Sequence, residues 1–196
     1  PQKGSVIDLF GGSNTVAQSL INDYTIYTND YQAYSYIAAK ALIEYHSTNV
    51  INSLTLEKVF GKYYKENKAE LTKRFSTPLA AEKKFLDDIG DLYYGPTFDK
   101  FTDYFDHSAY AGHPENSHPV FNSCISYYSS AEIQKYRENS KLFPYSLFTL
   151  YYGNPYFSIH QCVEIDSINY SIDKLLESGE ITDEEHSIYL SFLIYC

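Results

Sequence analysis

The sequence predicts an α/β fold that opens with a strand–helix–strand–helix unit, and three observations support this prediction. Residues 5–10 read SVIDLF, a short apolar run with β-branched residues that ends at a Gly-Gly turn, as a buried strand does. Residues 25–28, TIYT, have the same character and indicate a second strand. Helical patterns over residues 15–21 and 31–46 follow the two strands, so we expect a parallel sheet with a right-handed crossover.

The next part of the chain predicts helices followed by a long loop. Residues 54–92 are charged and have apolar residues at helical spacing. Within them, Pro78 is expected to open a further helix over residues 79–88. Residues 95–122 are rich in His, Asp, Pro and Gly, which predicts a long loop or an insertion.

Helix signals return in the last third of the chain. Ser130 is a candidate N-cap, and a longer helix is expected over residues 159–177 with Gly179 as its stop. Thr182 and Glu185 have the spacing of a capping box, which predicts a final helix. The mainly helical remainder and the opening unit suggest a division into residues 1–50 and 51–196.

Composition limits the classes of function. The chain has 196 residues, 44% of them hydrophobic, enough for a globular core. The formal net charge of −10 disfavours a grip on a phosphate backbone by this chain alone. Three widely spaced cysteines suggest no disulfide framework, and neither a signal peptide nor a membrane-spanning run is visible, so a cytoplasmic protein is expected. The sequence starts at Pro1 and ends in an apolar run, so we expect the protein to continue beyond this chain.

The most informative stretch is the glycine loop Asp8-Leu9-Phe10-Gly11-Gly12-Ser13. A glycine loop after a strand lets the backbone approach a ligand closely, and the following helix start presents free N–H groups to a carboxylate. Asp30 lies 22 residues after Asp8, at the end of the second strand. A carboxylate at that position can accept both ribose hydroxyls of an adenosine.

Two classes of adenosine cofactor fit this geometry. A dinucleotide requires G-x-G-x-x-G, which the loop lacks, since Asn14 and Ala17 occupy the later positions. S-adenosylmethionine has no pyrophosphate but carries an α-amino group, which the carboxylate of Asp8 would suit. The residues therefore favour S-adenosylmethionine, with a glycine turn in an unrelated α/β fold as the alternative.

The stretch VIDLFGGSNTVAQ, followed by YTNDYQAYSYIAAKALIEY, resembles the opening of DNA adenine N6-methyltransferases, which have D-L-F-x-G-S/T-G and then N-D-x-Q-x-Y-S. The resemblance implies a Rossmann-like methyltransferase unit whose first motif binds the methionine part of the cofactor and whose second binds its ribose. The candidate cofactor-binding residues are Asp8, Phe10, Gly11, Gly12, Ser13 and Asp30. Asn14 departs from the family glycine, but Asn tolerates left-handed backbone, so the turn can survive with weakened cofactor affinity.

A second stretch, Tyr156–Ile172, is similar to a segment of the same family, in which Gln161 and Asp166 are either contacts or surface polar groups. The family's catalytic tetrad, D/N-P-P-Y/F, holds the flipped adenine. This sequence has no such tetrad, and Asn154–Phe157, with one proline, is its nearest counterpart. We assign no catalytic residue, and the resemblance implies that the tetrad lies beyond the chain end.

Other clusters indicate no further site. His107, His113 and His118 share one polar loop, but their spacing fits no metal template, so no metal is expected. Cys124 and Cys162 read as small core residues.

Three functions remain open. The chain is the cofactor-binding part of an enzyme that methylates double-stranded DNA, a split or truncated subunit that needs a second chain with the catalytic motif, or a non-catalytic module that binds proteins. The chain alone is expected to be inactive.

Overall fold

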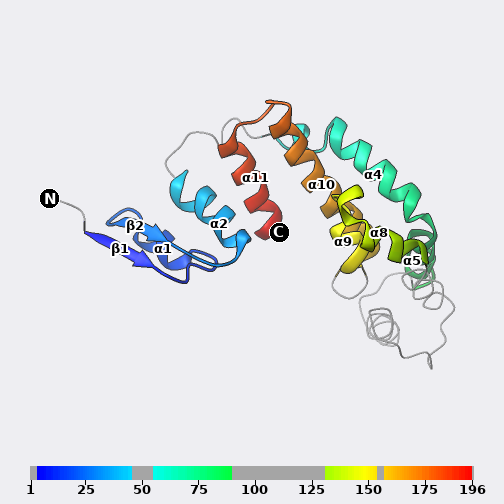
Figure 1. Cartoon of the computed structure of the whole chain (residues 1–196), viewed down its shortest axis with the longest axis horizontal. Helices are drawn as coiled ribbons and strands as arrows, with labels where there is room; N and C mark the ends of the chain where they lie inside the picture. The colour runs from blue at the N-terminus through cyan, green and yellow to red at the C-terminus, as the bar shows by residue number, and fades with distance from the viewer. Residues whose placement is uncertain (1–3, 46–54, 90–130, 154–156, 196) are drawn as a thin grey trace, which may run out of the picture. The chain divides into compact units, whose positions relative to one another are not determined.

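The computed structural model describes residues 4–45, 55–89, 131–153 and 157–195. Within them the chain is mostly helical, with one small sheet (Figure 1). It divides into two compact units: unit 1 comprises Pro1–Gly61 and Ser171–Cys196, and unit 2 comprises Lys62–Tyr170. Each unit is described by itself.

Unit 1 begins with the predicted strand and helix order. Strand β1 (Ser5–Asp8), helix α1 (Thr15–Leu20), strand β2 (Thr25–Thr28) and helix α2 (Ala33–Ala39) follow one another, and α2 continues as the π-helical turn η1 (Lys40–Glu44). The strands pair in parallel, with Ser5 opposite Thr25 and Asp8 opposite Thr28. The prediction of a parallel βαβ arrangement is therefore confirmed.

The prediction that the first strand is buried is wrong for the described residues. Ile7 and Tyr27, which are paired across the sheet, are 66% and 58% exposed. Val6 and Ile26, which point to the opposite face, are half buried. Because side chains alternate between faces, the described residues cover only one face of this two-stranded sheet.

The C-terminal helix completes unit 1. Helix α11 (Asp183–Tyr195) lies beside α2 (Figure 1). It starts at the predicted capping box: the Thr182 amide donates to Glu185 Oε2 at 2.9 Å, and the Glu185 amide donates to Thr182 Oγ1 at 3.2 Å. Gly179, at φ +74°, follows the preceding helix as expected. The short helix α3 (Leu56–Val59) also belongs to this unit.

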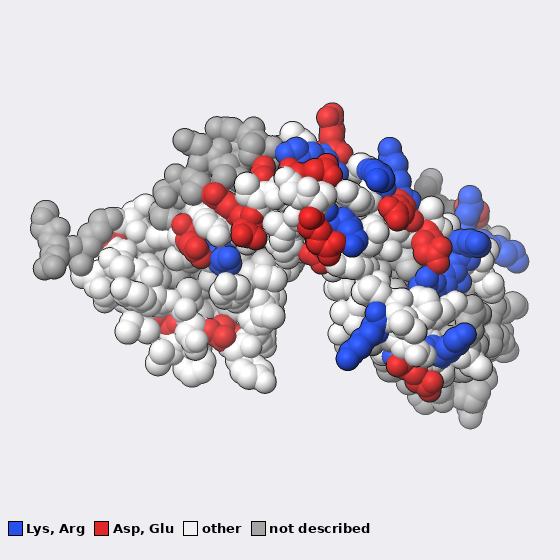
Figure 2. Space-filling view, turned by 45° about the horizontal axis from the view of Figure 1, so that its top comes forward, with Lys and Arg blue, Asp and Glu red and all other residues white. Residues whose placement is uncertain are grey.

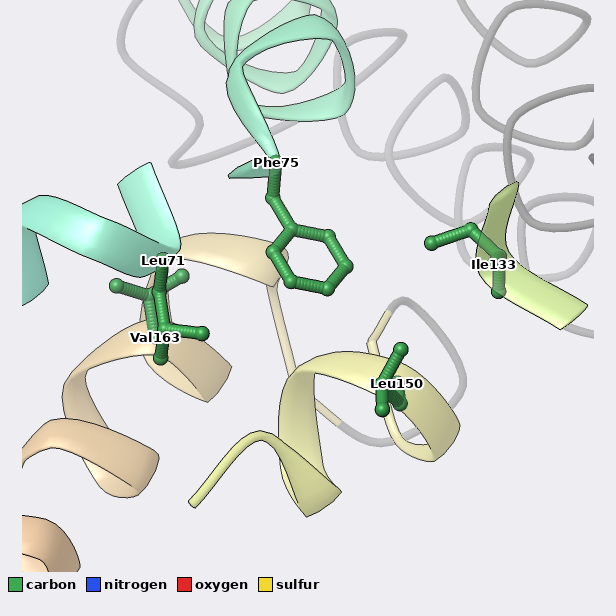
Figure 3. Close-up of a cluster of buried hydrophobic side chains, with 5 residues drawn as sticks. All are labelled: Leu71, Phe75, Ile133, Leu150 and Val163. Atoms are coloured by element: carbon green, nitrogen blue, oxygen red, sulfur yellow. The ribbon is translucent and has the colours of Figure 1, made fainter. Parts of the chain in front are cut away.

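Helices are the main elements in the described part of unit 2, which also has an isolated bridge between Gly153 and Phe157. It contains α4 (Lys62–Arg74), α5 (Ser76–Ile89), α8 (Ala131–Glu138), the 3₁₀ turn η3 (Ser140–Leu142), α9 (Leu147–Tyr151) and most of α10 (Ile159–Glu177), which crosses into unit 1 after Tyr170. The helix that Pro78 was expected to open is α5, which begins at Ser76, two residues before Pro78. The predicted loop over residues 95–122 lies outside the described residues. A buried apolar cluster joins the helices of unit 2 (Figure 3): Leu71, Phe75, Ile133, Leu150 and Val163.

Two buried carboxylates tie helices of unit 2 together. Glu82 of α5 is 3% exposed and accepts the amides of Ile159 and His160 at 2.7 and 3.0 Å, so it caps the start of α10. Asp166 of α10 is 2% exposed and accepts two amides at the start of α9. Cys162 is fully buried beside them, and burial raises the pKa of its thiol, which confirms that it is a core residue.

Candidate cofactor-binding site

The glycine loop connects β1 to α1 beside the end of β2. The two strands run parallel, so the segments that follow them leave the sheet at the same end. The Asn29 amide donates to the Asp8 carbonyl at 2.8 Å, and the Gly11 amide donates to the Asn29 carbonyl at 3.0 Å. These two bonds extend the pairing past the strand ends and bring Asp30 to the loop.

Asp30 contacts the glycine loop directly. Its Oδ2 accepts the Gly12 amide at 2.9 Å, and its Oδ1 accepts the Gln32 amide at 2.8 Å. The amides of Gln32 and Gly12 hold the pKa of the Asp30 carboxyl below its usual value of 3.8, so this group is an anion at neutral pH. A carboxylate offers about four acceptor positions, and the amides of Gly12, Gln32 and Tyr31 use up to three of them, so acceptor capacity remains for at least one hydroxyl.

Glycine is favoured at positions 11 and 12 for two different physical reasons. Gly12 has φ +51°, a left-handed conformation that glycine adopts without steric cost. Gly11 is buried, and a Cβ atom there would overlap the Thr28 hydroxyl and lie 2.9 Å from Asn14 Oδ1. A larger residue at position 11 would require Thr28 or Asn14 to shift, whereas at position 12 the cost would be strain of the left-handed backbone.

Asn14 is the loop residue whose role the sequence analysis missed. Its backbone is left-handed, at φ 59° and ψ 24°, which confirms that Asn keeps the turn that a family glycine would make. Its side chain is fully buried and bonded at both ends. Oδ1 accepts the Thr28 hydroxyl at 2.9 Å, and Nδ2 donates to the carbonyls of Ser35 and Gly12 at 3.1 and 3.3 Å. The Ser35 hydroxyl also donates to the Gly12 carbonyl, at 2.6 Å.

The other predicted residues lie along the same loop. The Phe10 amide donates to Asp8 Oδ1 at 3.2 Å, and the Phe10 ring is 87% exposed. The hydroxyls of Ser13 and Thr15 are 2.9 Å apart. From α11, the Tyr195 hydroxyl donates to the Ser13 carbonyl at 3.1 Å. The structure thus brings the six candidate residues to one loop and the adjoining strand end, while their role in binding stays a prediction.

The second family-like segment has structural roles wherever it is described. Gln161 is exposed and forms a capping box with Ser158 at the start of α10, with bonds of 2.9 and 3.0 Å. Asp166 is buried, so the interpretation as a surface polar group is wrong for this residue. Residues 154–156 lie outside the described part, while Phe157 packs edge-on against Phe148.

The histidine loop and Cys124 also lie outside the described residues. Among the residues that are described, no group of His, Cys, Asp and Glu side chains could hold a metal ion. In the same part of the chain, every helix is too short or too polar to cross a membrane.

The family comparison covers the candidate site. The model of the D12 class N6 adenine-specific DNA methyltransferase family matches residues 1–143, which include the glycine loop and Asp30 but not the second segment. No curated protein and no solved structure matches the chain. Because the match spans well over half of the 196 residues, the chain belongs to the D12 class N6 adenine-specific DNA methyltransferase family.

Proposed function

We propose that the chain binds S-adenosylmethionine at the glycine loop and is the cofactor-binding part of a DNA adenine N6-methyltransferase with a Rossmann-like unit. One observation carries the proposal: the Asp30 carboxylate lies against the Gly12 amide at the shared end of two parallel strands. The Asp30 carboxylate would accept hydrogen bonds from the ribose hydroxyls, and the Asp8 carboxylate would accept them from the α-amino group. Phe10 lies two residues after Asp8, and its exposed ring is apolar surface that a bound ligand would cover.

Calorimetric titration with S-adenosylmethionine tests this proposal. We expect binding by the full chain and a loss of at least about tenfold in affinity for Asp30→Ala, because a charged hydrogen-bond partner is removed. Asp23→Ala is the matched control, since Asp23 is an exposed carboxylate in the turn before β2. Absence of binding by the unmodified chain, or equal affinity for both variants, would overturn the assignment.

The methyl donor would be held here, and the acceptor adenine elsewhere. The bound cofactor would supply an activated methyl group for direct displacement by the adenine amino nitrogen. No D/N-P-P-Y/F tetrad occurs in this sequence, so we propose that the base is held by residues outside it, in a longer chain or in a second chain. A tritiated-cofactor assay on double-stranded DNA should show no turnover by this chain alone. Robust turnover would instead implicate Asn154–Phe157.

The uncovered sheet face favours a requirement for further polypeptide. Parallel sheets are normally covered on both faces, and an isolated two-stranded sheet is marginal in water. Ile7, Leu9 and Tyr27 are all more than half exposed. We therefore expect Ile7→Asp to prevent productive association with a tetrad-bearing chain. The same variant should leave the affinity for S-adenosylmethionine within about twofold, because the apolar Ile7 side chain has no group that could form a hydrogen bond to the loop.

Residues 51–196 would contribute target recognition, and among the described helices of this range α4 is the best suited to DNA. Its 13 residues include five basic and two acidic ones, despite the acidic chain overall. Lys62, Lys65 and Lys73 are exposed, and their spacing places them on one face of the helix. Figure 2 shows Lys and Arg side chains on this unit, interspersed with Asp and Glu. Replacing all three by Gln should weaken DNA binding by the active assembly and lower its dependence on salt.

A further inference from the structure

We propose that Asn14, Thr28 and Ser35 form a polar clamp that holds the glycine loop in its cofactor-binding conformation before the ligand arrives. This inference rests on the proposed function, because it concerns the same loop. It reverses the expectation that Asn14, as a departure from the family glycine, weakens the affinity for the cofactor.

The clamp joins three elements of unit 1. Asn14 lies at the end of the loop, Thr28 is the last residue of β2, and Ser35 lies in the first turn of α2. Asn14 Oδ1 accepts from Thr28 and Nδ2 donates to the Ser35 carbonyl, so the side chain bridges the strand and the helix. Asn14 and Ser35 are 0% and 1% exposed, which shields these bonds from competing water.

The clamp also fixes the orientation of the loop peptide. The Gly12 carbonyl accepts from Asn14 Nδ2 and from the Ser35 hydroxyl, at 3.3 and 2.6 Å. The amide of the same residue donates to Asp30 Oδ2. With both backbone groups of Gly12 bonded, the loop and the Asp30 carboxylate are held in one relative position.

A glycine at position 14 could adopt the same backbone angles but would provide none of the side-chain bonds. It would also have more freedom in the unfolded and ligand-free states. Ordering a loop during binding lowers affinity, whereas a loop ordered in advance avoids that cost. The clamp would therefore raise the affinity for S-adenosylmethionine by ordering the loop in advance.

The test is a set of variants measured by calorimetry with S-adenosylmethionine. Asn14→Gly and Thr28→Val should each weaken binding about three- to tenfold, as expected for loss of buried hydrogen bonds. The double variant should be no weaker than Asn14→Gly alone, because Thr28 acts on the loop through Asn14. If the two side chains acted on binding independently, the two losses in affinity would add instead.

A matched serine pair separates the clamp from general packing. Ser35→Ala and Ser171→Ala each remove a buried hydroxyl that donates to a backbone carbonyl at 2.6 Å, on Gly12 and Val59 respectively. The first should weaken cofactor binding, and the second should not, although both lower thermal stability. Equal affinities for the unmodified chain, Asn14→Gly and Ser35→Ala would overturn the proposal.

Hydrogen exchange of the ligand-free chain keeps the two proposals distinguishable. In the unmodified chain, the amides of Gly11 and Gly12 should exchange slowly, since both are hydrogen bonded. They should exchange at least about tenfold faster in Asn14→Gly and Thr28→Val. Unchanged exchange would refute the clamp even if the cofactor binds. Faster exchange without any cofactor binding would support the clamp and refute the proposed function.

Discussion

Replacing Asp166 by Ala should destabilise unit 2 more than any exposed substitution in that unit. This carboxylate is 2% exposed and accepts three hydrogen bonds. The amides of Phe148 and Thr149 donate at 3.1 and 2.8 Å, and the Thr149 hydroxyl donates at 2.6 Å. The two amides belong to the start of α9, where no N-terminal N–H has a partner within its own helix. Truncation would remove the acceptor of all three hydrogen bonds.

The expected decrease in the free energy of unfolding follows from the loss of the hydrogen bonds made by those three donors. Losing the acceptor of a buried donor costs about 1–3 kcal/mol, so losing the shared acceptor of three hydrogen bonds should cost about 3–5 kcal/mol in total. Asp166→Asn keeps one carbonyl oxygen but places an NH₂ group against a donor, so we expect about 1–3 kcal/mol. Both losses are large for a domain whose total stability is of the order of 5–15 kcal/mol.

The pH dependence provides a further check on Asp166. Burial raises the pKa of its carboxyl above the usual value of 3.8. The folded state therefore favours the protonated form, and this contribution to stability is fully present below pH 3.8 and lost as pH rises through the folded-state pKa. The advantage of the unmodified chain over Asp166→Asn should accordingly be larger at pH 4 than at pH 7.

Hydrogen exchange with mass spectrometry, reported for α9 and α10 separately, measures the loss within unit 2. Urea unfolding followed by far-UV circular dichroism gives the effect on the whole chain. Asp87→Ala is the control, since Asp87 is exposed on α5 in the same unit, and its cost should stay within about 0.5 kcal/mol. If Asp166→Ala and the control show the same protection and the same urea midpoint, the cap on α9 contributes nothing and the reasoning is wrong.

Three further outcomes are expected. Amide donors depress the pKa of Asp30, so the contribution of this carboxylate to stability should be present above pH 3.8 and lost as the pH falls through the folded-state pKa. Titration by NMR checks this, and a pKa above 3.8 would contradict it. Glu82→Gln should cost about 1–2 kcal/mol in urea unfolding, by weakening the cap on α10; an unchanged midpoint would exclude that role. Tyr195→Phe, at a 50% exposed residue, should speed amide exchange in the glycine loop while changing stability by no more than about 0.5 kcal/mol. The comparison variant is Tyr189→Phe, which removes the part-buried hydrogen bonds between Tyr189 and Thr55. It should lower stability more than Tyr195→Phe and leave amide exchange in the glycine loop unchanged, and the opposite ranking would count against the contact between Tyr195 and the loop.

Local patterns predicted the elements around the site well. The strand order, the parallel pairing and the capping box at Thr182 depend on residues close in sequence, and the structure has all three. The left-handed conformation at Asn14 was also predictable, because it depends on the residue's own backbone preference. The Gly11 requirement is different, since it comes from Thr28 on the next strand.

Burial was predicted less well, because a short apolar run does not specify what covers it. SVID is as compatible with a buried central strand as with a strand open on one face, and Ile7 is exposed. The burial of Asp166 was equally unspecified, because helical spacing alone is compatible both with a residue that makes a contact and with a surface polar group. Its neighbour Thr149 is 17 residues away, so only packing of α10 against α9 decided that it is buried.

The sequence by itself determined the βαβ order, the glycine loop, the position of Asp30 after the second strand and the family resemblance. These features depend on residue types close together in the sequence, because backbone preference and hydrophobic periodicity are local properties. Only the tertiary structure decided that Asp30 bonds to Gly12, that Asn14 bridges Thr28 and Ser35, and that one face of the sheet is uncovered. The physical reason is that hydrogen bonds and burial depend on which distant segments meet, and no local pattern specifies those partners.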